Sequence, residues 1–207
     1  MKFPFKKYYK ISSFTNHYFK ELQRCIESLN YSDLKKIINV LDKLYKNKNG
    51  TLYVCGNGGS AAISNHFACD HQKILSQIKP LRPMITSLSS NSAIMTAISN
   101  DINYSEVFVE QLKAVANKND VLLVISSSGS SKNIIKALDW ANKFKIKTIS
   151  FTGFDGGYAK KKAKFNIHCD SYNYGIIESM HHNIMNIISQ YIRNKYSSSK
   201  KISTEMF

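Results

Sequence analysis

A glycine-rich segment, Gly56 to Ser60, follows a short apolar run and precedes a helix-like stretch. Its glycines allow a tight turn and let backbone N–H groups approach an anion closely. The following helix would add the positive end of its dipole. The segment does not match GxGxxG and no Walker lysine follows it, so a nucleotide is not specifically indicated. It predicts a site for a phosphate group, with a plain strand-to-helix turn as the alternative.

A serine-rich segment, Ser126 to Ser131, follows a second apolar run and again precedes a helix-like stretch. Its hydroxyl and backbone N–H groups can donate several neutral hydrogen bonds to a phosphate without a fixed cation. A serine-rich turn by itself is usually only a loop. Two such turns at strand-to-helix junctions of one sheet predict two sides of a single anion site.

His66 and Asp70 lie one turn apart on the helix predicted after the glycine-rich segment. Side chains at this spacing share one face of a helix. An imidazole and a carboxylate so placed can transfer protons or share a divalent ion such as Zn²⁺. A surface hydrogen bond is the alternative, and for an isolated pair it is the more frequent one.

Five short apolar runs alternate with helical stretches and must position these groups. This alternation predicts an α/β fold, a doubly wound five-stranded parallel sheet of the flavodoxin-like type with helices on both faces. In such sheets, ligands bind beyond the carboxyl ends of the strands, which is where both segments fall. The predicted strands cover residues 51–55, 84–88, 121–126, 147–151 and 165–169.

The two ends of the chain are predicted to be helical. Apolar residues recur at helical spacing between about 14 and 48, and again from Tyr174 to Tyr196. We therefore expect a single domain, with N-terminal helices in residues 1–50 and the ligand-binding core in residues 51–193. The polar tail, residues 194–207, is predicted to be disordered.

The composition of the 207-residue chain narrows the function classes. The formal net charge is +15, but the lysines are spread over the whole chain and accompany no nucleic-acid-binding motif, so nucleic acid is not expected as a partner. No apolar run is long enough to span a membrane, and no signal peptide is indicated. Scattered cysteines without metal-site spacing are expected to be free thiols in a cytoplasmic protein. They are Cys25, Cys55, Cys69 and Cys169.

Four motifs in order, CGNGGSAA…HF, SNDINY…F, ISSSGSSKN and TGFDGG, resemble those of the sugar isomerase (SIS) domain family, of the phosphoheptose isomerase type. The resemblance covers residues from about 14 to 193. It implies a homotetramer that converts sedoheptulose 7-phosphate into D-glycero-D-manno-heptose 7-phosphate for lipopolysaccharide or capsule heptose; several members bind zinc. By motif position, it implies substrate contacts at Asn57, Gly58, Gly59, Ser60, Asn100, Asp101, Ser126, Ser127, Ser128 and Ser131.

The residues expected to move protons depart from the family pattern. Asp70 stands where the family has a Glu, Glu178 where it has a Gln, and Asn186 where it has a His. A neutral amide cannot transfer a proton and is a poor zinc ligand. His182, one turn from both Glu178 and Asn186, is our hypothesis for the replacement, with His181 as the less favoured one. The expected catalytic and zinc-binding set, with one ion per subunit, is His66, Asp70, Glu178 and His182.

Two functions of different classes follow from this pattern. The first is a ketose–aldose isomerase acting on a sugar phosphate. The second is a non-catalytic sugar-phosphate sensor or replication-initiator adaptor, which the family's fold also serves. The retained grouping of His66, Asp70 and Glu178 favours the enzyme, whereas Asn186 and the shortened acid at Asp70 favour the binding module.

Overall fold

The computed structural model describes residues 2–47 and 49–204, which form a five-stranded, all-parallel sheet between two layers of helices. The strand order β2-β1-β3-β4-β5 confirms the predicted doubly wound fold. The strands are β1 (Leu52–Gly56), β2 (Ile85–Ser87), β3 (Val121–Ser126), β4 (Lys147–Thr152) and β5 (Phe165–His168).

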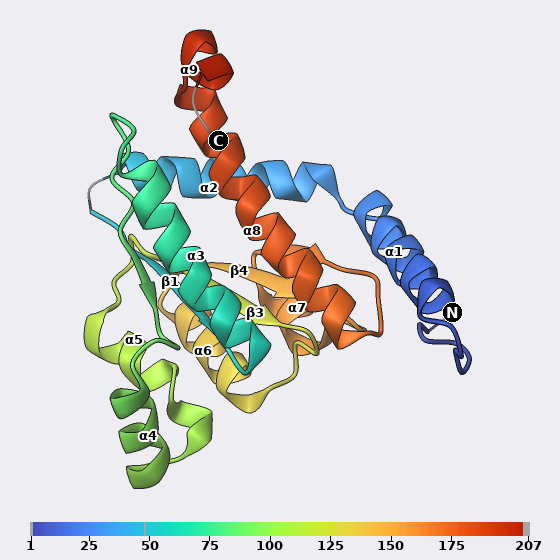
Figure 1. Ribbon diagram of the computed structural model, residues 1–207. Coiled ribbons are helices and arrows are strands. Elements are labelled where there is room, and N and C mark those ends of the chain that lie inside the picture. Colours follow the sequence, from blue (N-terminus) through green and yellow to red (C-terminus); the bar gives the residue numbers. More distant parts are fainter. Residues whose placement is uncertain (1, 48, 205–207) are drawn as a thin grey trace.

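Helices cover both faces of the sheet, with α3 and α8 side by side on one face and α6 and α7 on the other (Figure 1). The longer helices are α1 (Ile11–Glu27), α2 (Tyr31–Lys46), α3 (Gly59–Leu75), α4 (Ser92–Asp101), α6 (Lys132–Lys143) and α8 (Tyr174–Tyr196). The shorter ones are the 3-10 helix η1 (Tyr104–Glu106), α5 (Val109–Val115), α7 (Gly157–Lys162) and α9 (Ser199–Thr204). No helix among the described residues is both long and apolar enough to cross a membrane.

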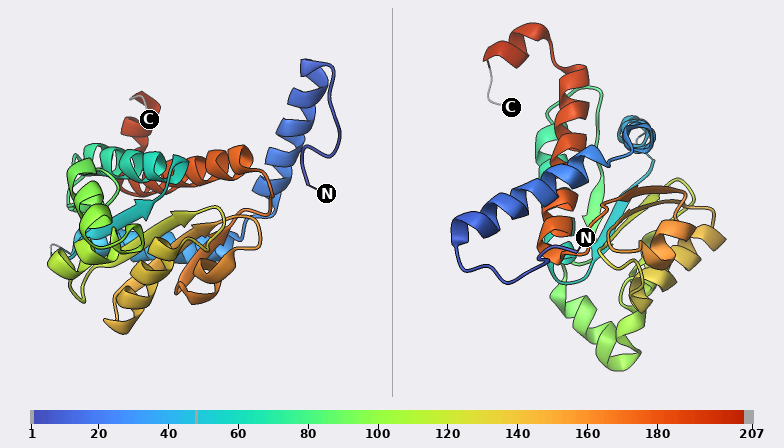
Figure 2. Two further views of the ribbon diagram at one scale, coloured as in Figure 1. Left: turned by 90° about the horizontal axis from the view of Figure 1, so that it is seen from below. Right: turned by 90° about the vertical axis from the view of Figure 1, so that its right-hand side faces the viewer.

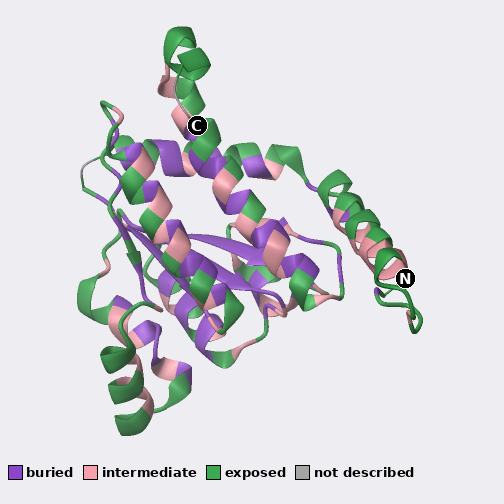
Figure 3. Ribbon diagram, viewed as in Figure 1, coloured by how far each residue is buried: buried purple, intermediate pink, exposed green. Residues whose placement is uncertain are grey.

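Two hydrophobic cores lie on opposite faces of the sheet, because successive side chains of a strand point to opposite faces. In β1, Leu52 and Val54 join the core under α2, α3 and α8. Tyr53 and Cys55 join the core under α5 and α6. The central strands are therefore apolar without alternation and are buried along their whole length (Figure 3).

The direction in which successive strands are added to the sheet reverses between β1 and β3. From β1 it crosses to β2 at one edge, and it then returns to place β3 on the other side of β1. At this switch point, the connections leaving the two strands diverge and open a crevice. The glycine-rich segment follows β1 and the serine-rich segment follows β3, so the topology brings both segments together.

Helix α1 projects from the layered body (Figure 2). Its one buried residue is Cys25, whereas the apolar side chains of Ile11 and Phe19 are 79% and 60% exposed. Helix α4, at another side of the molecule, contains no buried residue although it is rich in apolar side chains. These two helices have apolar surface that the described residues do not cover.

The C-terminal region differs from the prediction of a disordered tail. Helix α8 continues to Tyr196, and α9 follows, with the hydroxyl of Ser198 accepting a hydrogen bond from the backbone N–H of Lys201 at 3.3 Å. A serine in this position caps the start of a helix. The prediction of disorder rested on the polar composition of the tail and did not take this capping signal into account. Residues 205–207 lie outside the described residues.

The cysteines are free thiols, as expected. Three are buried and Cys69 is exposed. Burial raises the pKa of Cys25 to about 11 and that of Cys169 to about 12, so both remain protonated thiols at neutral pH.

Candidate functional site

A cavity of about 280 Å³ lies at the switch point, beyond the carboxyl ends of β1 and β3. It is lined by the two predicted segments and by the start of α8. The lining residues are Asn57, Gly58, Gly59, Ser60, Ile125, Ser126, Ser127, Ser128, Ser131, Tyr174 and Glu178. The structure thus brings together eight of the ten predicted substrate-binding residues.

Two glycines of the first segment are required by its geometry. Gly58 has φ +53° and ψ −123°, a conformation that a residue with a side chain adopts only under strain. A Cβ on Gly59 would lie 2.5 Å from the carboxyl carbon of Glu178. The missing side chains therefore shape the turn and leave room for the Glu178 carboxylate against it.

The serine-rich segment is fixed by bonds to its own residues and to a neighbouring loop. The backbone N–H of Gly129 donates to Ser126 Oγ at 3.1 Å, and that of Gly153 donates to the Ser127 carbonyl at 2.9 Å. Gly129 has φ +62°, and a Cβ there would overlap the carbonyl oxygen of Gly156. The hydroxyls therefore stand on a turn that packs tightly against the loop after β4.

The helices that begin at the cavity lack the side-chain caps found elsewhere in the molecule. Helices α2, α4 and α8 each begin with an asparagine whose side chain accepts a backbone N–H bond. Helices α3 and α6 begin at Gly58 and Ser131, and neither has a side-chain cap. The N–H of Ala61 already bonds to the Asn57 and Gly58 carbonyls, and that of Ile134 to Asn133 Oδ1, so the N–H groups of the first two residues of each helix are the ones left for an anion, which the helix dipoles favour.

The side chain of Asn57 is held by two other elements. Asn57 and Asn133 exchange amide hydrogen bonds of 3.0 and 2.9 Å, and the hydroxyl of Tyr104 donates to Asn57 Oδ1 at 2.8 Å. Both acceptor positions of Oδ1 are thereby used. Asn57 thus ties the glycine-rich segment to α6 and η1. Because its side-chain oxygen Oδ1 is already used, its backbone is the part that remains for a ligand.

Glu178 is the one carboxylate among the described residues that line the cavity. It lies on α8, half-buried, with its carboxylate against Gly59 at the start of α3. Positive helix ends stabilise a carboxylate and also a developing oxyanion. The group is therefore in position to accept and return a proton of a ligand bound in the cavity.

His66, Asp70 and His182 form a separate cluster farther along α3 and α8. The Nε2 of His66 lies 3.0 Å from Asp70 Oδ2, and the rings of His66 and His182 meet edge to face with centroids 4.6 Å apart. Burial, with His66 adding to it, lowers the pKa of His182. None of the three lines the cavity.

The predicted set of four zinc ligands is therefore divided, with Glu178 in the cavity and the other three residues in the cluster. Among the described residues of one chain, no group of three or more His, Cys, Asp or Glu side chains could hold a metal ion. In His66 and Asp70, the imidazole and the carboxylate already bond to each other. The residues of a single chain thus do not fit the zinc ion implied by the resemblance.

His181 is directed into the core, so of the two neighbouring histidines it is not the one that could replace the imidazole missing at Asn186. It is fully buried, and its Nε2 donates to the carbonyl oxygen of Thr152 at 3.2 Å. Burial lowers the pKa of His181 to about 4. His182 is therefore the histidine of the pair that reaches His66.

Asn100 and Asp101, predicted as substrate contacts, lie outside the cavity of the single chain. Both are exposed at the end of α4, and the Asn100 amide donates to the Asp101 carboxylate at 2.8 Å. Neither residue lines the cavity where the other eight meet, and α4, which ends with them, lies to the side of the sheet (Figure 1).

Sequence reasoning missed Tyr174, Ile125, Tyr104 and Asn133 as parts of the site. Tyr174 precedes Glu178 by one helical turn, a spacing that places both side chains on one face. This spacing could have predicted that Tyr174 lies beside Glu178 in the site. The contact of Tyr104 with Asn57 depends on how α4 and η1 fold back, and no local pattern marks it.

The fold defines an α/β domain whose cavity at the switch point is lined by two turns suited to a phosphorylated ligand. The SIS domain model matches residues 17–153. The phosphoheptose isomerase of Helicobacter pylori (strain P12) is 36% identical over 178 residues, covering 85% of this chain and 90% of that protein. A probable phosphoheptose isomerase of Thermoplasma acidophilum is 36% identical over 182 residues, covering 86% of this chain and 97% of that protein.

A solved structure agrees with these relatives. The structure of a phosphoheptose isomerase from Francisella tularensis matches with a TM-score of 0.78 and 27% identity, covering 89% of this chain and 96% of that one. The chain belongs to the SIS domain family, and within that family to the phosphoheptose isomerases.

Proposed function

We propose that the protein is the ketose–aldose isomerase that converts sedoheptulose 7-phosphate into D-glycero-D-manno-heptose 7-phosphate, for lipopolysaccharide or capsule heptose synthesis. The observation that carries this proposal is the convergence of two uncapped helix starts and a serine-rich turn on a cavity that contains one carboxylate. The names of the relatives supply the substrate class.

The lining residues divide into a phosphate end and a reacting end. Ser126–Ser128, Ser131 and the start of α6 donate to the phosphate oxygens. The carboxylate of Glu178 then removes the proton from C1 of the ketose, which gives an enediol, and returns it to C2, while the hydroxyl proton moves from O1 to O2. Backbone N–H groups at the start of α3 stabilise the negative charge that develops on oxygen.

A direct assay separates this function from its alternative. The purified chain is incubated with sedoheptulose 7-phosphate, and aldose formation is followed. Aldose formation supports the isomerase. Saturable binding without turnover supports a sugar-phosphate sensor, which the divided catalytic set favours, and no binding at all contradicts both.

A homotetramer is part of the proposal, supported by the exposed apolar positions of α1 and by α4, which buries no residue (Figure 3). Light scattering should then give four times the chain mass of 23.5 kDa. A monomer in solution contradicts it. We place the enzyme in the cytoplasm, where its three buried thiols remain reduced.

Zinc enters the proposal only through the assembly. His66, Asp70 and His182 of one chain do not by themselves form a metal site, so a zinc ion there needs ligands from outside the chain, and a second copy is the source that the homotetramer supplies. We expect about one zinc ion per subunit after purification in zinc-containing buffer, and loss of that zinc in Asp70→Asn with phosphate binding unchanged. Equal zinc content in Asp70→Asn and the unaltered protein contradicts this placement.

A further inference from the structure

Tyr174, the first residue of α8, lines the cavity although it is 62% exposed. It lies one turn before Glu178, so both side chains reach the cavity from the same helix face. Its hydroxyl has no hydrogen bond to another described residue, and its ring stands at the mouth of the cavity. An exposed tyrosine so placed offers an apolar ring face and a free donor to a ligand.

The ring of Tyr174 is held in place by Phe154, from the loop after β4. The two rings meet edge to face at 84°, with centroids 4.7 Å apart. Phe154 has φ +47°, a conformation that strains a residue with a side chain. Two contacts hold Phe154 in this conformation: its backbone N–H donates to the Ser171 carbonyl at 2.9 Å, and its ring stacks on that of Tyr172. Strain of this kind is kept where surrounding bonds over-determine a position.

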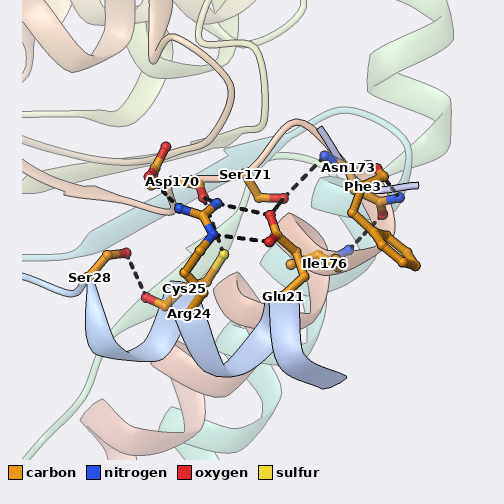
Figure 4. A network of polar contacts seen from close by, with 9 residues as sticks. All are labelled: Phe3, Glu21, Arg24, Cys25, Ser28, Asp170, Ser171, Asn173 and Ile176. Atoms are coloured by element: carbon orange, nitrogen blue, oxygen red, sulfur yellow. Dashed lines mark hydrogen bonds and ion pairs between the residues drawn. The ribbon is translucent and has the colours of Figure 1, made fainter. Parts of the chain in front are cut away.

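A polar network fixes the start of α8 from the other side (Figure 4). The guanidinium of Arg24 on α1 binds the carboxylates of Glu21, at 2.9 Å, and Asp170, at 2.7 Å. The hydroxyl of Ser171 donates to Glu21 at 3.3 Å, and the Asn173 side chain caps α8 by accepting from the Ile176 N–H at 3.1 Å.

The charges of this network are mutually stabilised. Hydrogen bonding to Arg24 lowers the pKa of both Glu21 and Asp170. The loop of residues 170–173 is thereby anchored to α1 by ionised groups at neutral pH. The first turn of α8, and Tyr174 with it, is positioned by α1, by this loop and by Phe154 together.

We propose that Tyr174 contacts the carbon chain of the bound sugar phosphate and sets the preferred chain length. Its ring packs on the C–H face of the carbons that reach the cavity mouth, and its hydroxyl bonds to a sugar hydroxyl there. With its phosphate at Ser126–Ser131 and C1 at Glu178, a ketose phosphate of seven carbons bows its middle carbons outward to the mouth, whereas one of five carbons spans the same two points without reaching it. This assignment rests on the proposed function, because it takes the phosphate to lie at Ser126–Ser131.

Calorimetric binding of three probes tests the assignment without relying on turnover. The probes are sedoheptulose 7-phosphate, ribulose 5-phosphate and inorganic phosphate. Tyr174→Ala should weaken binding of the seven-carbon probe about ten-fold, and Tyr174→Phe about three-fold, since one loses the ring and the hydroxyl and the other only the hydroxyl. Binding of the other two probes should stay within about two-fold of the unaltered protein.

Two further variants separate positioning from a general loss of structure. Phe154→Gly keeps the positive φ without strain and removes the ring that supports Tyr174, so it should weaken seven-carbon binding in the same direction. Tyr191→Ala removes another exposed tyrosine of α8, 56% exposed and outside the cavity lining, and should change nothing.

Each outcome decides between definite alternatives. Tyr174→Ala with unchanged seven-carbon binding, or with equal losses for all three probes, overturns the chain-length role. If the unaltered protein binds the probes but forms no aldose, the isomerase proposal fails while the role of Tyr174 is still measured. In an active enzyme, the same variant should raise KM with kcat within about two-fold.

Discussion

The cavity at the switch point and the His66–Asp70–His182 cluster lie on the same pair of helices but are built differently. The cavity is formed by turns that are continuous in the sequence and set by glycines, helix starts and strand ends. The cluster joins side chains from the outer faces of α3 and α8 and leaves them partly exposed. One chain therefore gathers eight of the ten predicted substrate contacts in one cavity, whereas its described His, Cys, Asp and Glu side chains form no metal site.

The largest expected effect falls on Glu178, which separates proton transfer from recognition. Glu178→Gln keeps the shape of the side chain and gives the residue that the family has at this position, but it removes the carboxylate that this chain would use to accept a proton. We expect kcat to fall about 10²- to 10⁴-fold, with KM unchanged or lower because a negative charge leaves the anion cavity. Steady-state kinetics measure both constants. A variant with unaltered kcat would move the proton-transfer role from the cavity to the cluster.

A second change acts on the backbone of the cavity. Gly58→Ala forces a side chain into a conformation that costs about 1–3 kcal/mol, although no neighbouring atom lies within 4 Å of the new Cβ. The turn should relax, and affinity for sedoheptulose 7-phosphate should fall about ten-fold or more. Calorimetry measures this loss, and Gly175→Ala near the start of α8 is the control. Equal affinities in the two variants would show that the turn does not shape the ligand site.

The buried histidines contrast with the cluster and predict a pH effect on stability. Burial lowers the pKa of His71 to about 3 and that of His181 to about 4, against about 6.5 in an unfolded chain. Below pH 6.5 the unfolded state binds protons that the folded state does not. The free energy of unfolding should therefore fall towards pH 4, by about 1.4 kcal/mol per pH unit for each histidine.

Urea unfolding at pH 7, 6 and 5 measures this slope. His71→Gln should make the slope shallower, because one of the two groups is removed. The same slope in the variant and in the unaltered protein would assign the pH dependence to other groups.

The smallest expected effect concerns Tyr104, which ties η1 to the glycine-rich segment. Tyr104→Phe removes the hydrogen bond to Asn57 but leaves the two Asn57–Asn133 bonds in place. We expect KM to rise about five-fold, the size of one neutral hydrogen bond, with kcat little changed. Tyr9→Phe, at an exposed position of the N-terminal segment, serves as the control. A Tyr104→Phe enzyme with unaltered KM would show that Asn133 alone is enough to hold Asn57.

The sequence predicted the sheet and the two turns that line the cavity because both depend on local patterns. Apolar runs and helical periodicity identified the five strands and the range of α8, and glycine and serine turns identified Gly58 and Ser126. Contacts between elements far apart in the chain have no such local pattern in the sequence, so they could not be predicted from it. The exposure of Asn100, the burial of His181 and the reach of Tyr104 each depend on how a helix is rotated or folded back.

The uncapped starts of α3 and α6 have a consequence for the stability of the whole protein. In the free protein, these N–H groups are left to water. In the proposed complex, the phosphate accepts from the start of α6 and the oxygens of the reacting carbons accept from the start of α3, so the ligand acts as the missing cap of both helices. The folded chain should melt at a higher temperature as sugar phosphate accumulates, and its lifetime in a cell should follow the supply of its own substrate.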